Sequence, residues 1–174
     1  YLAAFFAHKA LRFAGMGVAD PYAPEPIRQF LAAAASGADP AMEIYALCLA
    51  ESGRVLATFG GAVSEHRFSG MMTAFDPDPE IARFSPGDLL LQHLVGDQTA
   101  RGRRGFDLGV GEARYKASIC DETIGLVETI VPVSLRGRAY GVARMALTRT
   151  KRRIKRDPRL YAVAARLRKL TRRS

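Results

Sequence analysis

One stretch, Phe84–Lys116, restricts what this chain can fold into more than any other. It opens as a helix with a marked start: Ser85 suits the N-cap, Pro86 the first helical position and Asp88 the acidic position of a capping box. The apolar spacing that follows predicts a helix as far as Arg101, whose charge favours the negative end of the helix dipole. The stretch therefore predicts one well-defined helix at the centre of the fold.

A short strand is predicted directly after this helix, over Gly105–Gly109. It leads into a turn or short helix over Gly111–Ile119, which holds three polar side chains, Glu112, Tyr115 and Lys116. Strand ends that open onto polar residues are where α/β proteins usually hold their active sites. We therefore expect the functional site at this strand end.

The sequence before this stretch predicts two helices and three strands. They are the helices Tyr1–Phe13 and Pro26–Ala35 and the strands Met42–Glu51, Arg54–Val63 and Phe68–Phe75. Short polar connections between the strands predict an antiparallel meander. The pair Gly60 and Gly61 in the second strand predicts a bulge or a place where something approaches the backbone closely.

After the central stretch, a strand is predicted over Leu126–Val133, a helix over Gly137–Lys155 and a last helix beyond Asp157. The order of elements predicts an α/β (α+β) fold with a mixed, mostly antiparallel sheet and helices on both of its faces. We expect one domain over residues 1–148 and a basic helical tail over residues 149–174.

The basic charge of the chain is concentrated in that tail. The net charge is +9, but residues 149–174 hold 12 basic residues and one acidic residue, which leaves the rest of the chain slightly acidic. A basic amphipathic helix suits an anionic membrane surface, and it also suits a nucleic acid such as tRNA. The third interpretation is a helix docked on the domain, with its arginines in water, through a set of apolar residues: Leu160, Val163, Leu167 and Leu170.

Composition excludes several other classes of protein. A hydrophobic content of 48% over 174 residues argues against disorder, and no apolar run approaches the about 18 residues that span a bilayer. Cys48 and Cys120 lack the spacing of a metal or redox pair, so we expect core or partly buried thiols in a reducing cytoplasm, and the scattered histidines predict no metal site. Because the first helix begins at Tyr1 without a cap, we expect that a natural N-terminal segment precedes it.

Two phrases carry a family resemblance: FSPGDLLL at residues 84–91 and FDLGVGEARYK at residues 106–116. Together they resemble the bacterial CelD-like (cellulose-biosynthesis-type) branch of the GNAT acyltransferase superfamily, which is related in fold to Fem-type peptidyltransferases. The resemblance extends over about residues 1–134. It implies a GNAT-like sheet and direct transfer of an acyl group from acyl-CoA to an amine or hydroxyl, without a metal. The acceptor would be a small molecule or a glycan precursor in exopolysaccharide or cell-envelope synthesis.

The resemblance also implies where the acyl donor lies. The strands before and after the central helix part, the pantetheine arm fills the gap, and the phosphates approach the N-terminus of the helix, where free N–H groups attract anions. The sequence lacks the usual Arg/Gln-x-x-Gly-x-Gly/Ala phosphate loop, and Asp88 adds a carboxylate, so the same residues also read as a simple helix cap. The residues expected to contact the donor are Thr73, Phe75, Ser85, Gly87, Leu89 and Lys116.

For the chemistry, the resemblance implies that Tyr115 protonates the departing thiolate. A phenol is a plausible acid because its pKa of about 10 lies near that of a thiol. Glu112 and Asp107, with Asp76 as a further candidate, would accept the proton of the attacking amine. The alternative for this group is structural, with Tyr115 packed at a strand end and Glu112 paired with Lys116. Two other functions stay open: a Fem-type transferase that uses aminoacyl-tRNA, and a catalytically silent GNAT-like binding module. We expect a cytoplasmic location, at the inner membrane face if the tail binds lipid.

Overall fold

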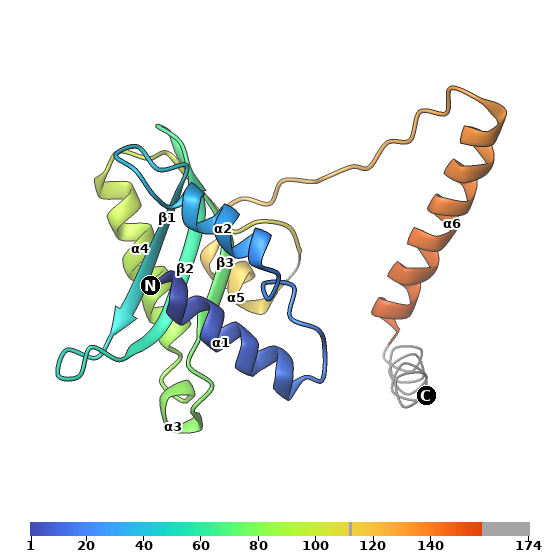
Figure 1. Ribbon diagram of the computed structural model, residues 1–174. Helices are drawn as coiled ribbons and strands as arrows, with labels where there is room; N and C mark the ends of the chain where they lie inside the picture. The colour runs from blue at the N-terminus through green and yellow to red at the C-terminus, as the bar shows by residue number, and fades with distance from the viewer. Residues whose placement is uncertain (112, 158–174) are drawn as a thin grey trace. The chain divides into compact units, whose positions relative to one another are not determined.

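The computed structural model describes residues 1–111 and 113–157 (Figure 1). The chain divides into two units, one over residues 1–121 and one from residue 122 onwards. Glu112 and the predicted helix beyond Asp157 lie outside the described residues. The boundary predicted between residues 148 and 149 stays a prediction, and it falls inside a continuous helix.

The first unit is built on one four-stranded sheet. Its strands are β1 (Met42–Cys48), β2 (Val55–Val63), β3 (Arg67–Phe75) and β4 (Gly105–Asp107), in that order across the sheet. β1–β2 and β2–β3 are antiparallel and β3–β4 is parallel. The predicted meander and the mixed, mostly antiparallel sheet are therefore confirmed.

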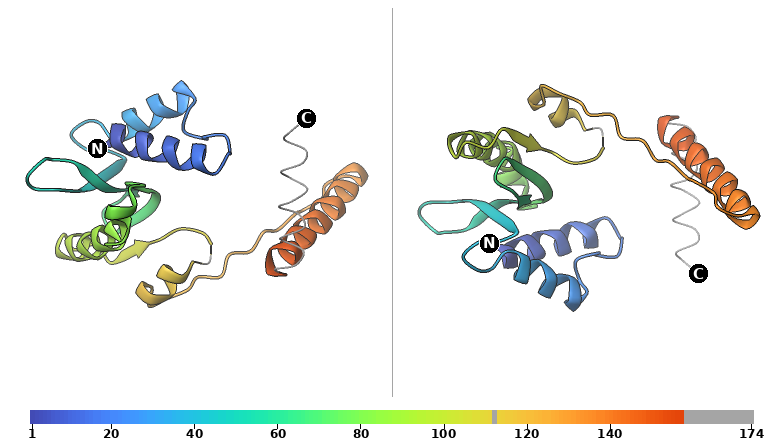
Figure 2. Two further views of the ribbon diagram at one scale, coloured as in Figure 1. Left: turned by 90° about the horizontal axis from the view of Figure 1, so that it is seen from below. Right: turned by 90° about the horizontal axis from the view of Figure 1, so that it is seen from above.

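Helices cover both faces of this sheet. The helices of the unit are α1 (Leu2–Gly15), α2 (Glu25–Ala34), α3 (Pro79–Ala82), α4 (Pro86–Ala100) and α5 (Arg114–Ile119). α1 and α2 lie over one face, and α4 lies over the other (Figure 2). The predicted central helix is thus α4, and it packs on the sheet through a buried stripe that includes Leu90, Leu91 and Leu94.

Two hydrophobic clusters hold these layers together. The α4-side core consists of Ala57, Phe59, Phe68, Leu90, Leu91 and Leu94. The α1-side core consists of Phe5, Leu31, Met42, Met72 and Ala74. Phe106 of β4 extends the α4-side core, since its ring stacks on that of Phe68 with the centroids 5.0 Å apart.

The predicted irregularity at Gly60 and Gly61 is confirmed as a β-bulge. Gly60 pairs with Met72 and Gly61 pairs with Gly70, so Met71 of β3 has no partner in β2. Side chains alternate between the two faces along a strand, and one extra residue reverses that alternation. Before the bulge β3 therefore contributes to the α4-side core, and after it β3 contributes to the α1-side core.

Gly61 and its ladder partner Gly70 allow two aromatic rings to approach the backbone closely. A Cβ on Gly61 would lie 2.4 Å from the carbonyl oxygen of Ser69 and 2.7 Å from the ring of Phe68. A Cβ on Gly70, its partner in the ladder, would lie 2.8 Å from the ring of Phe59. Because Gly61 and Gly70 have no side chains, they leave space for the rings of Phe68 and Phe59 in the α4-side core.

The second unit differs from the prediction. Residues 122–133 form no strand, so the strand predicted over Leu126–Val133 is wrong. Its Val-rich sequence favours extended backbone, but Val127 and Val133 are 91% and 95% exposed, and no strand of the described residues pairs with the segment. The predicted helix is confirmed as α6 (Leu135–Arg156), which begins where the Ser134 hydroxyl accepts a hydrogen bond from the Gly137 N–H at 3.0 Å.

Two further findings concern the thiols and the membrane. Cys48 and Cys120 are both exposed, so the expected burial is wrong. Each lies at the edge of an element, Cys48 as the last residue of β1 and Cys120 directly after α5, where little packs over it. Over the residues that the structure describes, no helix is both long and apolar enough to cross a bilayer.

Candidate active site

The site begins where β3 and β4 separate. Their parallel ladder has three pairs and stops at Ser69 and Asp107, while β3 continues to Phe75. Beyond Asp107 the chain turns away at Gly109, which has φ +71° and would bring a Cβ within 3.2 Å of the carbonyl oxygen of Gly70. The second half of β3 therefore has an edge that β4 does not cover.

Asp107 and Lys116 hold the turn that follows β4. The Asp107 Oδ1 accepts a hydrogen bond from the Gly109 N–H at 2.7 Å. The Lys116 ammonium donates to the carbonyl oxygens of Gly109 and Val110, at 3.0 and 3.3 Å. One oxygen of Asp107 remains for other partners, whereas the Lys116 ammonium is already bound to two backbone carbonyls.

Tyr115 lies in the first turn of α5. Its half-buried ring packs against the α4-side core. Burial raises the pKa of its phenol, and the charges of Cys120 and of Asp88 raise it further. A phenol is protonated at neutral pH in any case, which is the state that a proton donor needs, and the raised pKa makes its proton harder to lose to solvent. Asp88, which contributes to this shift, belongs to the first turn of α4.

The N-terminus of α4 has an unusual backbone. Ser85 is its N-cap residue, as predicted, but it adopts φ +50° and ψ 55°, and its side chain makes no cap hydrogen bond. Instead, its carbonyl oxygen accepts from the N–H groups of Asp88 and Leu89, at 2.9 and 3.2 Å. The predicted capping box is therefore not formed. A left-handed backbone outside glycine costs about 1 kcal/mol, and such residues concentrate at functional sites.

Gly87 carries the one backbone donor at this terminus that is free in the described part of the chain. Its N–H has no partner among the described residues, and a Cβ on it would meet nothing within 4 Å. Pro86 has no N–H, and the Asp88 and Leu89 N–H groups already bind the Ser85 carbonyl. The terminus thus offers one free donor and the positive end of the helix dipole, beside the exposed carboxylate of Asp88.

The other residues predicted to contact the acyl donor differ in how exposed they are. Thr73 pairs with Phe59 across the ladder, so it is half-buried on the α4 face of the sheet. Phe75 is 38% exposed, and the Arg12 guanidinium lies 5.3 Å from the centre of its ring. Leu89 is 45% exposed on α4. The structure thus brings Asp107 and Lys116 together on the turn after β4, with Tyr115 on the core side of α5, and it does not describe the predicted base Glu112.

Asp76, the further candidate for a base, is already paired. Its carboxylate binds the Arg54 guanidinium at 2.7 Å and accepts a hydrogen bond from the Asp78 N–H at 3.0 Å. Burial acts to raise the pKa of Asp76, but the Asp78 N–H and the Arg54 guanidinium outweigh it and lower that pKa. These bonds fix the end of β3.

A polar network at the other end of α4 has no counterpart in the sequence analysis. Arg103 binds both carboxylate oxygens of Glu43, at 2.9 and 3.2 Å, and also the side-chain oxygen of Gln98. The Tyr45 hydroxyl donates to Glu43 and accepts from Gln98. The network joins β1, the C-terminal part of α4 and the approach to β4. Its central pair is 60 residues apart in the sequence, so no local pattern marks it.

Comparisons with known proteins agree on the fold. The acetyltransferase (GNAT) domain family matches residues 1–117. A crystal structure of a probable acetyltransferase is similar with a TM-score of 0.54 and 16% identity, over 76% of this chain and 89% of that one. At this identity the similarity establishes the fold alone, and no curated protein matches significantly. From the family match over two thirds of its length, the chain belongs to the GNAT acetyltransferase domain family.

Proposed function

We propose that this chain transfers an acyl group from acyl-CoA directly to an amine or hydroxyl acceptor, with Tyr115 as the proton donor. Membership of the GNAT family supports acyl transfer in general. The observation that carries the specific proposal is the half-buried Tyr115 ring, which packs against the α4-side core from the start of α5, after the turn that follows the point where β3 and β4 separate.

The uncovered edge of β3 would hold the pantetheine arm of the donor. A strand edge presents backbone N–H and C=O groups in a row, and the arm carries two amides that can pair with them. Thr73 and Phe75 belong to this half of β3. The free Gly87 N–H would bind one phosphate oxygen, with Ser85 and Leu89 beside it.

The reaction needs two proton movements. The acceptor nitrogen or oxygen attacks the thioester carbonyl carbon, and its new bond to that carbon replaces the carbon–sulfur bond. The leaving thiolate takes the proton of the Tyr115 hydroxyl. The proton lost by the acceptor passes to a carboxylate, either Glu112 or the free oxygen of Asp107, directly or through water.

The acceptor is proposed from the sequence alone. The resemblance to the CelD-like branch favours a precursor of exopolysaccharide or of the cell envelope. Asp107 at the open end of β4 would attract an acceptor amine as its ammonium before that amine loses its proton.

Substitution of Tyr115 by Phe tests the proposal. Thiol release from acetyl-CoA, followed with a thiol reagent in the presence of candidate amines, should fall by about 10²-fold or more, because general acid catalysis contributes that much. Acetyl-CoA should still raise the melting temperature of the variant. Tyr1→Phe is the matched control, since Tyr1 is 66% exposed and removal of its hydroxyl should leave turnover unchanged.

Three outcomes would contradict parts of the proposal. Unchanged turnover in Tyr115→Phe removes the phenol from the mechanism. A donor at 100 times its dissociation constant stabilises the fold by about 2.7 kcal/mol, so the absence of any shift at millimolar acetyl-CoA rejects the donor. Binding of acetyl-CoA without turnover of any amine or hydroxyl would favour a silent binding module.

A further inference from the structure

Helix α6 combines a high positive charge with a complete lack of acidic residues. Its 22 residues contain nine Lys or Arg and no Asp or Glu. Most surface helices balance their charges through pairs three or four residues apart, and α6 cannot form such pairs within itself. The one described ion pair of α6 joins Arg144 to Glu128, at 3.8 Å.

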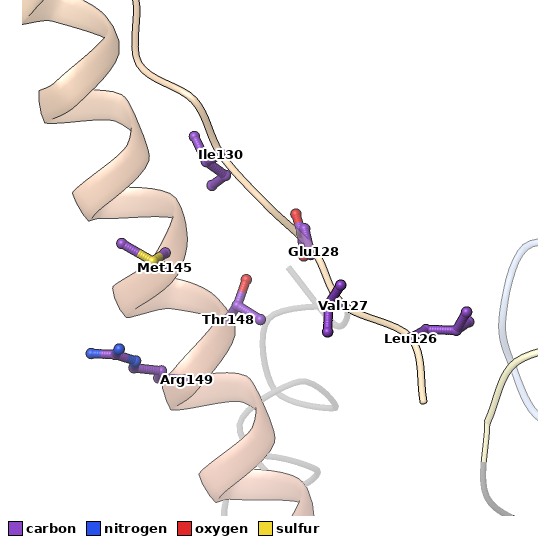
Figure 3. A pocket seen from close by; sticks show the side chains of 7 residues that line it. All are labelled: Leu126, Val127, Glu128, Ile130, Met145, Thr148 and Arg149. Carbon is purple, nitrogen blue, oxygen red and sulfur yellow. The ribbon is translucent and has the colours of Figure 1, made fainter. Parts of the chain in front are cut away.

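One side of α6 is covered by the chain that precedes it. The Ile130 side chain lies 3.3 Å from where a Cβ on Gly141 would stand, so this helix face receives the segment closely. Leu126–Ile130 and the helix residues Met145, Thr148 and Arg149 enclose an open groove of about 270 Å³ between them (Figure 3). The segment therefore occupies the face of α6 that contains Gly141 and Thr148.

The opposite side of the first half of α6 is mostly apolar and exposed. With 100° of rotation per residue, Arg136 projects into the sector opposite Gly141, and Thr150 and Arg153 continue that sector in the second half. The apolar members of the sector are Leu135, Ala139, Val142, Ala143, Ala146 and Leu147. All six are exposed, with fractions of 82% for Leu135, 65% for Val142 and 49% for Leu147. We call this set the apolar arc. In the described part of the unit nothing covers it.

Arginines border the apolar arc on both sides. By the same rotation, Arg138 and Arg149 lie along one border and Arg144 lies beyond the other, while Arg136 lies between Ala143 and Leu147 at the first turn, where a long side chain can reach up to the headgroups. A helix that lies flat on a membrane has this arrangement, with an apolar face in the acyl boundary and cations level with the headgroups.

We propose that α6 lies on the surface of an anionic lipid bilayer and inserts the apolar arc between the lipids. The charge selects anionic headgroups, and the arc explains why a nucleic acid is the weaker candidate, since RNA would neutralise the arginines but leave the apolar residues in water. The proposal goes beyond the acyl transfer proposed above and does not depend on it.

Sedimentation of the full chain with vesicles tests the proposal. With 30% phosphatidylglycerol in phosphatidylcholine, partitioning should exceed that with phosphatidylcholine alone by at least thirtyfold, and it should weaken as salt is raised. Arg138→Gln with Arg149→Gln should lower it about 25-fold, at about fivefold for each charge. Leu135→Ser, Val142→Ser and Leu147→Ser together should lower it at least tenfold.

The matched control makes the same kind of change in the first unit. Leu11→Ser, Met16→Ser and Ile27→Ser replace exposed apolar residues of α1 and α2, and vesicle binding should stay as in the wild type. Equal binding to neutral vesicles, or full binding by the serine variant of the apolar arc, would overturn the proposal. The proposal would also be overturned if the wild type bound no vesicles and the serine variant lost thermal stability. Those two results together would mean that protein covers the apolar arc. Salt-sensitive tRNA binding that survives the serine changes, with no vesicle binding, would identify a nucleic-acid surface instead.

Discussion

Replacement of Gly61 by Ala tests the packing at the centre of the sheet. The new Cβ would lie 2.4 Å from the backbone oxygen of Ser69 and 2.7 Å from two atoms of the Phe68 ring. The backbone oxygen cannot rotate away, and Phe68 is fully buried between Phe59 and Phe106. The substitution therefore forces the β2–β3 ladder apart at the bulge.

The expected loss is at the upper end of the overpacking range, about 3 kcal/mol in the free energy of unfolding. For a chain of this size, that lowers the melting temperature by about 10 °C. Gly96→Ala is the matched control, since Gly96 lies in the interior of α4 and a Cβ there meets nothing within 4 Å. The same chemical change should therefore stabilise the fold at that position by about 0.8 kcal/mol.

Thermal and urea unfolding of the two variants, followed by circular dichroism, measures both effects. Opposite signs are expected, with Gly61→Ala clearly below the wild type and Gly96→Ala slightly above it. For a chain of this size, 1 kcal/mol corresponds to about 3 °C in melting temperature. If Gly61→Ala melts within about 2 °C of the wild type, the close contacts of Gly61 with Phe68 and Ser69 are wrong.

Three further perturbations address the polar groups. Arg103→Met should lower the free energy of unfolding, measured by urea titration, by about 2 kcal/mol, because the half-buried Glu43 loses its bidentate partner. Arg83→Gln is the control: it breaks an exposed surface pair and should change that free energy by less than about 0.5 kcal/mol. The hydrogen bond from Arg103 lowers the pKa of Glu43, so the stability that this pair contributes should be present at neutral pH and be lost as the pH falls below about 4.3. Between pH 7 and pH 3, the free energy of unfolding should therefore fall less in Arg103→Met than in the wild type. Asp107→Asn should keep the hydrogen bond to the Gly109 N–H that Asp107→Ala removes, so equal loss of turnover in both variants indicates a catalytic carboxylate, whereas loss in Ala alone indicates that Asp107 only holds the turn.

Local patterns in the sequence predicted most of the first unit. The Pro86 start and the leucine stripe located α4, the short polar connections predicted the meander, and the glycine pair at 60–61 predicted the bulge. Each of these signals depends on neighbours within a few residues, which is why each could be read from the sequence alone.

One error arises where distant parts of the chain decide the structure, and two further differences concern local geometry that residue types and spacing do not specify. The segment Leu126–Val133 has the composition of a strand, but a strand needs a partner, and none of the described strands pairs with it. Ser85 holds its predicted position but makes no side-chain cap bond, since its backbone is left-handed and not extended as in an ordinary N-cap residue. The pairing of Lys116 with two carbonyls of its own turn was likewise invisible to a reading of charge and spacing.

The extra residue in β3 has a consequence for how the first unit comes apart. Phe68 before the bulge belongs to the layer under α4, and Met72 and Ala74 after it belong to the layer under α1 and α2, on one strand that pairs with β2 on both sides of the bulge. Unfolding of either layer should therefore disrupt β3, which also packs against the other layer. The two clusters should therefore unfold in a single cooperative transition, and the amide hydrogens at the centre of β2 and β3 should exchange with solvent only when the whole unit opens.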